Sequence, residues 1–299
     1  MIPQFPTFKA VTLEDREDVE KFADRYPHYS DFNFSSLYAW DTGHTRALSI
    51  LHENLVVRFT DYATEEPFLS FLGGNRVDDT AEELFAYAAA NFLPPVLKMV
   101  PEISVHEMGN SFSVVPDEKH FDYVYLTERI ASLSGVQYKS KRHHVERFLR
   151  NYPSARFEML SLTDESVQRM MMNVVKTWDT IQHDDDPHEQ EAIQRFFDMA
   201  AQRPFLVGAI FVEDMLSAFT IDEIVVRQYA VSHFLKATNI YPGDRDFLNR
   251  EMARYLNAHS VTYWNWEQNL DVPNLRMWKN SYRPSDLLKK FTVTKRSKV

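Results

Sequence analysis

The sequence of 299 residues has no cysteine, few glycines and no long hydrophobic run. Without cysteine the chain forms no disulfide and has no thiolate nucleophile, and a reducing cytoplasm is its expected location. Only two of its seven glycines are adjacent, Gly73 and Gly74, so the sequence contains neither a Walker loop nor a GxGxxG dinucleotide loop. No stretch approaches ~18 uninterrupted apolar residues, so we predict no transmembrane helix.

What is present is an uneven distribution of charge. The formal net charge is -10, yet the segment 138–152, YKSKRHHVERFLRNY, has five Lys or Arg and one acidic residue. Residues 276–298 have eight Lys or Arg against one Asp. Such an asymmetry predicts an anionic partner at one place on the molecule. The alternative is a solvated helix and an unstructured tail.

The first basic segment has the pattern of an amphipathic helix, with an apolar stripe and a charged stripe. The apolar stripe consists of Val145, Phe148, Leu149 and Tyr152. The charged stripe, which we call the basic ridge, consists of Lys139, His143, Glu146, Arg147 and Arg150. Lys141 is expected to point inward. The ridge is suited to bind phosphates through charge-assisted hydrogen bonds, unless it is only a solvated surface.

Two pairs of similar segments predict a duplicated domain. The segment VTLEDREDVEKF (11–22) resembles LSLTDESVQRM (160–170), since each places a cap-like residue before a helical pattern. The segment LSILHENLVVRF (48–59) resembles AIFVEDMLSAF (209–219), since each has two apolar runs joined by a polar turn. Both pairs occur in the same order at about half the chain length.

The second half is predicted to mix helices and strands. Two helices precede a three-strand meander over residues 204–237, whose last strand is expected at 226–237. A helix over 245–259, a strand over 260–267, a helix over 272–282 and a final strand over 287–293 are expected to follow.

This order and four segments resemble a known family. The segments are SDFNFSSLYAWD (30–41), LSGVQYKSKRHHVERFLRNYP (133–153), SHFLKA (232–237) and WNWEQNLDVPNLRMWKNSYRP (264–284). Together they are similar to an uncharacterised bacterial family related to the C-terminal domain of phosphatidylglycerol lysyltransferase. The resemblance implies an α+β fold of two tandem GNAT-like acyltransferase domains, at residues 1–130 and 131–299. Each domain would be a mixed, mostly antiparallel sheet flanked by helices, and the second would contain the active cleft.

The chain departs from the family pattern in its last motif. Trp266 replaces an Arg, Asn269 replaces an Asp, and Asp271 and Asn274 replace two glycines, whereas Glu267 is retained. The glycine-rich pyrophosphate loop of GNAT enzymes that use acetyl-CoA is missing after SHFLKA. The membrane-embedded half of the lysyltransferase is missing too. These differences count against acetyl-CoA and against a lipid acceptor.

The resemblance also indicates where the chemistry would occur. Acyl transfer requires a base for the nucleophile and a donor to the oxyanion. In GNAT folds the fourth and fifth strands diverge, and here the divergence is expected to centre on His233 to Thr238. Glu267 closes the fifth strand and is the candidate base, unless it forms a structural ion pair with Arg276 or Lys279. Tyr282 is the candidate acid.

The candidates for binding a substrate or donor are mainly cations of the two basic segments. They are Lys139, Lys141, Arg142, Arg150, His233, Arg276 and Lys279. The alternative for His233 is a satisfied core residue, which is common for a single histidine in a strand. The segment QHDDDPHEQE (182–191) has ligand types for a hard metal. Because consecutive side chains do not converge on one ion, we predict a solvated acidic loop and no metal site.

The leading functional hypothesis is therefore an acyltransferase. It would move an aminoacyl group from aminoacyl-tRNA, or an acyl group from acyl-CoA, to an amine or hydroxyl of a small or lipid-borne acceptor, without a tightly bound cofactor. The alternative is a non-catalytic module that binds an anionic ligand through the basic ridge. A third hypothesis is peripheral contact with anionic lipid through residues 276–298. The sequence leaves the oligomeric state open.

Overall fold

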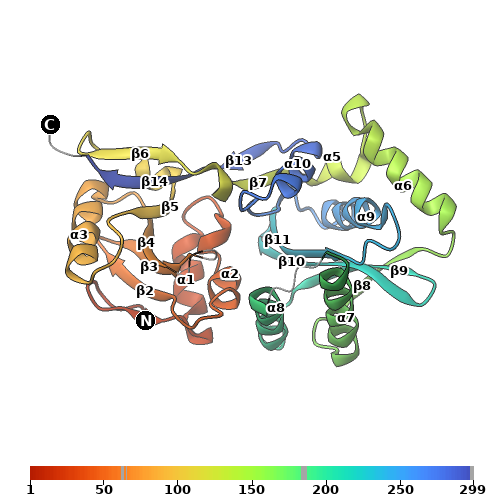
Figure 1. Cartoon of the computed structure of the whole chain (residues 1–299), viewed down its shortest axis with the longest axis horizontal. Helices are drawn as coiled ribbons and strands as arrows, with labels where there is room; N and C mark the ends of the chain where they lie inside the picture. The colour runs from red at the N-terminus through yellow and green to blue at the C-terminus, as the bar shows by residue number, and fades with distance from the viewer. Residues whose placement is uncertain (62–63, 65, 183–186, 297–299) are drawn as a thin grey trace. The chain divides into compact units, whose positions relative to one another are not determined.

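The chain divides into two compact units (Figure 1). The structure is a computed structural model that describes residues 1–61, 64, 66–182 and 187–296. Unit 1 comprises residues 1–122, 268–271 and 287–299, and unit 2 comprises residues 123–267 and 272–286. This division differs from the predicted border between residues 130 and 131, because residues 123–130 belong to unit 2 and the last residues return to unit 1.

Unit 1 is built on a seven-stranded sheet with the order β1-β2-β3-β4-β5-β14-β6. The pair β4–β5 is parallel and the other pairs are antiparallel. The strands are β1 (Lys9–Ala10), β2 (Ala47–Leu51), β3 (Asn54–Thr60), β4 (Pro67–Leu72), β5 (Leu97–Pro101), β6 (Phe112–Pro116) and β14 (Lys290–Lys295). The helices are α1 (Arg16–Ala23), α2 (Phe34–Ala39), α3 (Val77–Ala90) and α4 (Glu102–Val105).

The core of unit 1 follows from the amphipathic pattern of α3. Its apolar residues Val77, Ala81 and Leu84 pack on Val56 and Phe71 of the sheet. Figure 1 shows α3 on one face of β2–β5, and α1 and α2 on the other. The sheet is therefore covered on both faces, which explains why most residues of β3 and β4 are buried.

Unit 2 contains a second seven-stranded sheet, of the order β13-β7-β12-β11-β10-β9-β8. The strands are β7 (Asp122–Leu126), β8 (Arg156–Leu160), β9 (Leu206–Val212), β10 (Met215–Val226), β11 (Tyr229–Ala237), β12 (Tyr263–Asn265) and β13 (Asp286–Leu288). The helices are α5 (Thr127–Ser132), α6 (Lys139–Asn151), α7 (Glu165–Gln182), α8 (Pro187–Met199), α9 (Asp244–Ala258) and α10 (Pro273–Ser281). Figure 1 shows α7 and α8 on one face of β8–β11 and α9 on the other.

The two sheets have matching topologies. Strands β1 to β5 correspond in order and direction to β8 to β12, and each series ends in a parallel pair, β4–β5 or β11–β12. The next position is filled from elsewhere in the chain, by β14 in the first sheet and by β7 in the second, and both join antiparallel. The predicted similarity of 48–59 and 209–219 corresponds to the hairpins β2–β3 and β9–β10. In both hairpins a turn residue, Glu53 or Glu213, has positive φ.

Three predicted strands differ from the observed ones. The strand expected at 226–237 begins at Tyr229, because residues 225 and 226 still belong to β10. The strand expected at 260–267 is only three residues long. The last predicted strand is divided into β13 and β14, and β14 belongs to the first sheet. Hydrophobic pattern alone does not specify which sheet receives a terminal strand.

Candidate functional site

Strands β11 and β12 diverge near the middle of the second sheet. They pair in parallel over three positions, which end at Val231 and Asn265. Strand β12 stops there, whereas β11 continues to Ala237. The divergence begins after Val231, just before the segment from His233 to Thr238 on which the family resemblance centred it.

A β-bulge in β11 lies at this divergence. Ile221 of β10 faces Phe234, and the next residue, Asp222, faces Ser232, so His233 is the additional residue of the bulge. A bulge turns a side chain away from the regular alternation of a strand. It aims the His233 ring at the face covered by α8, where the ring lies 4.8 Å from that of Phe196.

His233 is the centre of a line of charged side chains. Its Nδ1 is 3.1 Å from Oε1 of Glu267, and its Nε2 is 3.0 Å from Oε2 of Glu223. Arg203 forms an ion pair with the same Glu223 carboxylate. We call these four residues the His233 cluster. A ring that donates from both nitrogens is an imidazolium, and a neutral ring between two carboxyls requires one of them to be protonated.

Burial within the cluster falls toward Glu267. The exposed fraction of the side chain is 0% for His233, 1% for Glu223 and 9% for Arg203, but 19% for Glu267. Glu267 is therefore the member of the cluster most accessible to a substrate. The other three are buried, and charges interact more strongly in the protein interior than at the surface.

The backbone at Glu267 has an unusual conformation. Its φ is 55°, in the left-handed region that a residue with a side chain adopts at some energetic cost. The Glu267 N–H donates to Oδ1 of Asn265 at 2.7 Å, and the Glu267 carbonyl accepts from the N–H of Tyr123 at 3.1 Å. These bonds hold the residue in the conformation that turns its carboxylate toward β11.

Tyr282 lies in a different group of side chains. It is fully buried, and its hydroxyl donates to Oδ1 of Asp246 at the start of α9. Burial and the neighbouring Asp246 raise the pKa of Tyr282 well above its usual range. Asp246 also accepts from Lys141 and His144 of α6. In this structure Tyr282 joins α10 to α9, and its role as an acid stays a prediction.

The predicted binding residues lie at three separate places, on α6, on α10 and, for His233, in the His233 cluster. Lys141 is buried against Asp246, as expected from its inward position, and burial lowers its pKa. Arg142 donates to the carbonyls of Leu133 and Gly135, so it holds the turn before α6. Lys279 is buried and donates to the carbonyl of Trp266 at 2.5 Å, and Arg276 is half-buried on α10.

The basic ridge is exposed as predicted. Helix α6 buries Val145 and Phe148 completely, and Lys139, His143, Glu146, Arg147 and Arg150 are all exposed. Of the four cations that the sequence assigned to donor binding in this segment, Lys139 and Arg150 lie on the solvent side. The other two have the structural contacts described above.

The second basic segment, 276–298, does not form one exposed surface within its described residues. Lys279 and Lys290 are buried. Lys289 pairs with Glu102 at 3.0 Å, and Lys295 pairs with Glu82. Residues 297–299 lie outside the described part of the chain.

The first turn of α9 has acidic residues where a phosphate-binding helix would present free amides. Asp244 is buried, and burial raises its pKa to about 7. Burial alone would also raise the pKa of Asp246, but Lys141, Tyr282 and His144 together hold it below its usual value. Two carboxyl groups at this helix N-terminus disfavour a bound pyrophosphate.

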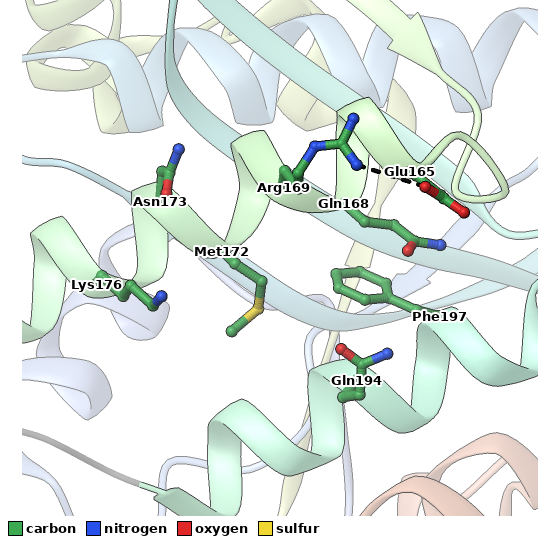
Figure 2. A pocket seen from close by; sticks show the side chains of 8 residues that line it. All are labelled: Glu165, Gln168, Arg169, Met172, Asn173, Lys176, Gln194 and Phe197. Atoms are coloured by element: carbon green, nitrogen blue, oxygen red, sulfur yellow. Dashed lines mark hydrogen bonds and ion pairs between the residues drawn. The ribbon is translucent and has the colours of Figure 1, made fainter.

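A hollow of about 410 Å³ lies between α7 and α8, apart from the His233 cluster (Figure 2). Met172 and Phe197 supply its apolar lining, and most of its other residues are polar or charged. The neighbouring Phe196 packs on the His233 ring instead.

Among the described residues, no group of three or more His, Cys, Asp or Glu could hold a metal ion. The predicted acidic loop falls largely on residues 183–186, outside the described residues.

The family of the chain follows from the similarity of its sequence to known proteins. The sequence profile named "Phosphatidylglycerol lysyltransferase, C-terminal" matches residues 23–294. The chain belongs to this family. None of the curated proteins matches it. No helix among the described residues of this family member is long and apolar enough to cross a membrane.

Solved structures agree on the fold. A conserved protein of unknown function from Bacteroides thetaiotaomicron has a TM-score of 0.82 and 22% identity, and the match covers 99% of this chain and 100% of that one. The C-terminal domain of a putative lysylphosphatidylglycerol synthetase from Agrobacterium fabrum has a TM-score of 0.67 and 11% identity, over 95% and 92% of the two chains. L-PGS from Bacillus licheniformis has a TM-score of 0.66 and 12% identity, over 100% and 95%. The chain thus has an α+β fold with two mixed sheets flanked by helices, which it shares with these structures.

The sequence analysis missed Glu223 and Arg203. Glu223 lies in the run TIDEIVV, and Arg203 precedes the proline before β9. The sequence did contain a signal for Glu223, the acidic pair Asp222-Glu223 inside an apolar strand, because a buried carboxylate requires a partner. Its partner was not predictable from the sequence, since Arg203 and His233 reach Glu223 from different elements.

Proposed function

We propose that this chain is an acyltransferase whose reaction centre is Glu267, at the divergence of β11 and β12. The observation that carries the proposal is the contact of a partly exposed Glu267 with the buried His233 ring. A carboxylate held at a strained backbone position, beside the part of β11 that extends past the end of β12, is a suitable general base. Membership of the lysyltransferase family and the GNAT-like fold support the reaction class.

In the proposed reaction a single group, Glu267, carries the proton from the nucleophile to the leaving group. The acceptor amine or hydroxyl attacks the ester carbonyl of the donor, and Glu267 takes the proton that the nucleophile loses. The bond between the carbonyl carbon and the donor oxygen then breaks, and Glu267 returns the proton to that oxygen. A donor to the oxyanion is expected from the edge of β11 beyond Val231, where β12 has ended.

Aminoacyl-tRNA is the donor that we favour over acyl-CoA. The exposed cations of the basic ridge suit a polyanionic donor. The acidic first turn of α9 does not suit the pyrophosphate of CoA. Because the profile is that of phosphatidylglycerol lysyltransferase, lysyl-tRNA with phosphatidylglycerol is the first pair to test, followed by small amines.

The decisive experiment compares wild-type protein with Glu267→Gln. Label transfer is measured from tRNA charged with ¹⁴C-lysine, or with a ¹⁴C-amino acid mixture, to phosphatidylglycerol vesicles or to amines. We expect transfer by the wild type and a fall in kcat of about 10²–10⁴ in Glu267→Gln, because the amide cannot accept the proton. Glu213→Gln is the matched control, since Glu213 is an exposed glutamate that also has positive φ.

Two results would contradict the proposal. Full turnover by Glu267→Gln would remove Glu267 as the base. Saturable binding of tRNA without transfer to any acceptor would favour the alternative, a non-catalytic module that binds an anionic ligand through the basic ridge.

A further inference from the structure

We propose that Glu223 and Arg203 are positioning residues that act on Glu267 through His233. The inference rests on the proposed function, and it adds two residues that the family pattern did not indicate. Glu223 fixes Nε2 of the ring, so that Nδ1 is aimed at Glu267. Arg203 fixes the Glu223 carboxylate.

The burial of the three inner residues supports a specific role. A buried carboxylate, a buried guanidinium and a buried imidazole lose hydration that their mutual contacts only partly replace. A core that served packing alone would fill this space with apolar residues at lower cost. Around the cluster the core is apolar, since Phe196 and Phe205 pack on the His233 ring at centroid distances of 4.8 and 6.4 Å.

The bulge explains why the ring requires such a support. His233 is the additional residue of β11 at this bulge, where the regular alternation of side chains along the strand is interrupted. The rings of Phe196 and Phe205 limit its tilt, but apolar contacts do not distinguish the two edges of an imidazole. The Glu223 carboxylate distinguishes the two edges, because it accepts a hydrogen bond from Nε2. The orientation of the Glu267 carboxylate is therefore set by a residue that does not touch it.

The test compares Glu223→Gln with Glu223→Leu. Gln keeps a hydrogen bond to Nε2 without the charge, whereas Leu has similar volume and no hydrogen bond. We expect kcat to fall in the order wild type, Glu223→Gln, Glu223→Leu, with a loss of ~10-fold or more in the last, and KM for donor and acceptor to stay unchanged. Asp222→Asn is the control, because Asp222 is a buried carboxyl on the opposite face of the same strand.

A second pair of variants keeps the test independent of the folding of Glu223→Leu. The amide of Asn in His233→Asn lies close to the position of Nδ1, and the amide of Gln in His233→Gln lies close to that of Nε2. We expect His233→Asn to retain a higher kcat than His233→Gln, because only the former keeps a contact with Glu267. Equal values for the two would overturn the proposed link from His233 to Glu267.

Crystal structures separate this inference from the proposed function. In Glu223→Leu we expect the His233 ring to turn and its distance from Glu267 to exceed hydrogen-bonding range, about 3.5 Å. If the contact is retained, or if kcat of the folded variant equals that of the wild type, Glu223 is not a positioning residue. Wild-type protein that transfers no acyl group would refute the proposed function, and the crystal structures would still decide whether Glu223 positions the ring.

Discussion

At the scale of single residues, two adjacent carboxyl groups in β10 have opposite environments. Glu223 faces Arg203 and His233, which are charged or chargeable partners. Asp222 faces neutral donors, the hydroxyl of Thr220 at 2.8 Å and the indole N–H of Trp264 at 2.7 Å. Burial raises the pKa of Asp222 to about 7, although both hydrogen bonds act to lower it. One carboxyl thus belongs to an ionic cluster, whereas the pKa of its neighbour lies close to physiological pH.

This difference predicts a pH-dependent effect of Asp222→Asn. Because the folded-state pKa of Asp222 is above its value of 3.8 in the unfolded chain, the wild type loses stability as the pH rises from about 4 to about 7. Asn resembles the protonated side chain and does not titrate. We expect the two proteins to be equally stable near pH 4, and the variant to be more stable by a few kcal/mol at pH 8.

Urea denaturation of both proteins between pH 4 and pH 8 measures this difference. The exposed Asp198 of α8 gives the control variant Asp198→Asn, which should follow the wild type at every pH. A constant difference between Asp222→Asn and wild type across the range would show that Asp222 is charged in the folded protein.

At the scale of elements, α6 unites two kinds of positive charge, an inner cation and solvent-side cations, as its sequence pattern predicts. Its inner cation, Lys141, forms an ion pair with Asp246 of α9, and this pair joins the two helices within unit 2. The solvent-side cations Lys139 and Arg150 belong to the basic ridge. Only the second kind is available to a partner, so removal of these two should affect binding more than stability.

The double variant Lys139→Ala, Arg150→Ala tests the ridge. If both cations contact phosphates, tRNA binds more weakly, and the slope of log Kd against log salt falls by about 1.5–2. Fluorescence anisotropy with labelled tRNA at several salt concentrations measures both effects. The double variant Lys21→Ala, Lys176→Ala removes the same charge from α1 and α7 and should change neither by a comparable amount. Unchanged tRNA affinity in the first variant would exclude the ridge as the binding surface.

At the scale of the whole molecule, the chain completes its first sheet with its last strand. Strand β14 inserts between β5 and β6, and its Lys290 is buried within unit 1. The Lys290 ammonium contacts Asp31 and lies 2.6 Å from Oδ1 of Asp122, which also accepts from Ser30. Burial acts to lower the pKa of Lys290, but the two carboxylates outweigh burial and raise it. The C-terminal strand is therefore held in unit 1 by a buried ionic contact as well as by backbone pairing.

Lys290→Met is expected to destabilise the protein by about 3–5 kcal/mol, because it leaves Asp31 and Asp122 buried without their cation. Lys289→Met is the matched control. Lys289 is 48% exposed beside Glu102, and its loss should cost less than about 1 kcal/mol. Chemical denaturation of both variants gives the two values. Equal values would mean that the buried ion pair contributes no more than a surface one.

Much of unit 2 could be predicted from the sequence, because local patterns specify local structure. Of the predicted apolar stripe of α6, Val145 and Phe148 are buried and Leu149 and Tyr152 are half-buried, and the meander predicted β9, β10 and β11 to within a few residues. Glu267 and His233 were chosen from a resemblance to a family, and their contact was not predicted. The bulge that aims His233 at α8 is a register shift between two strands, and a sequence does not show register.

The sequence by itself thus determined the meander and most helices of unit 2, the exposed basic ridge and the family, since these depend on patterns within short segments of the chain. Only the tertiary structure decided that Glu223 and Arg203 join His233, that Tyr282 and Lys141 meet at Asp246, and that the last strand returns to the first sheet. Each of these contacts joins residues from different elements. Charges attract one another more strongly once the fold has removed water from around them, and a buried charge without a partner is costly, so these contacts depend on the tertiary structure.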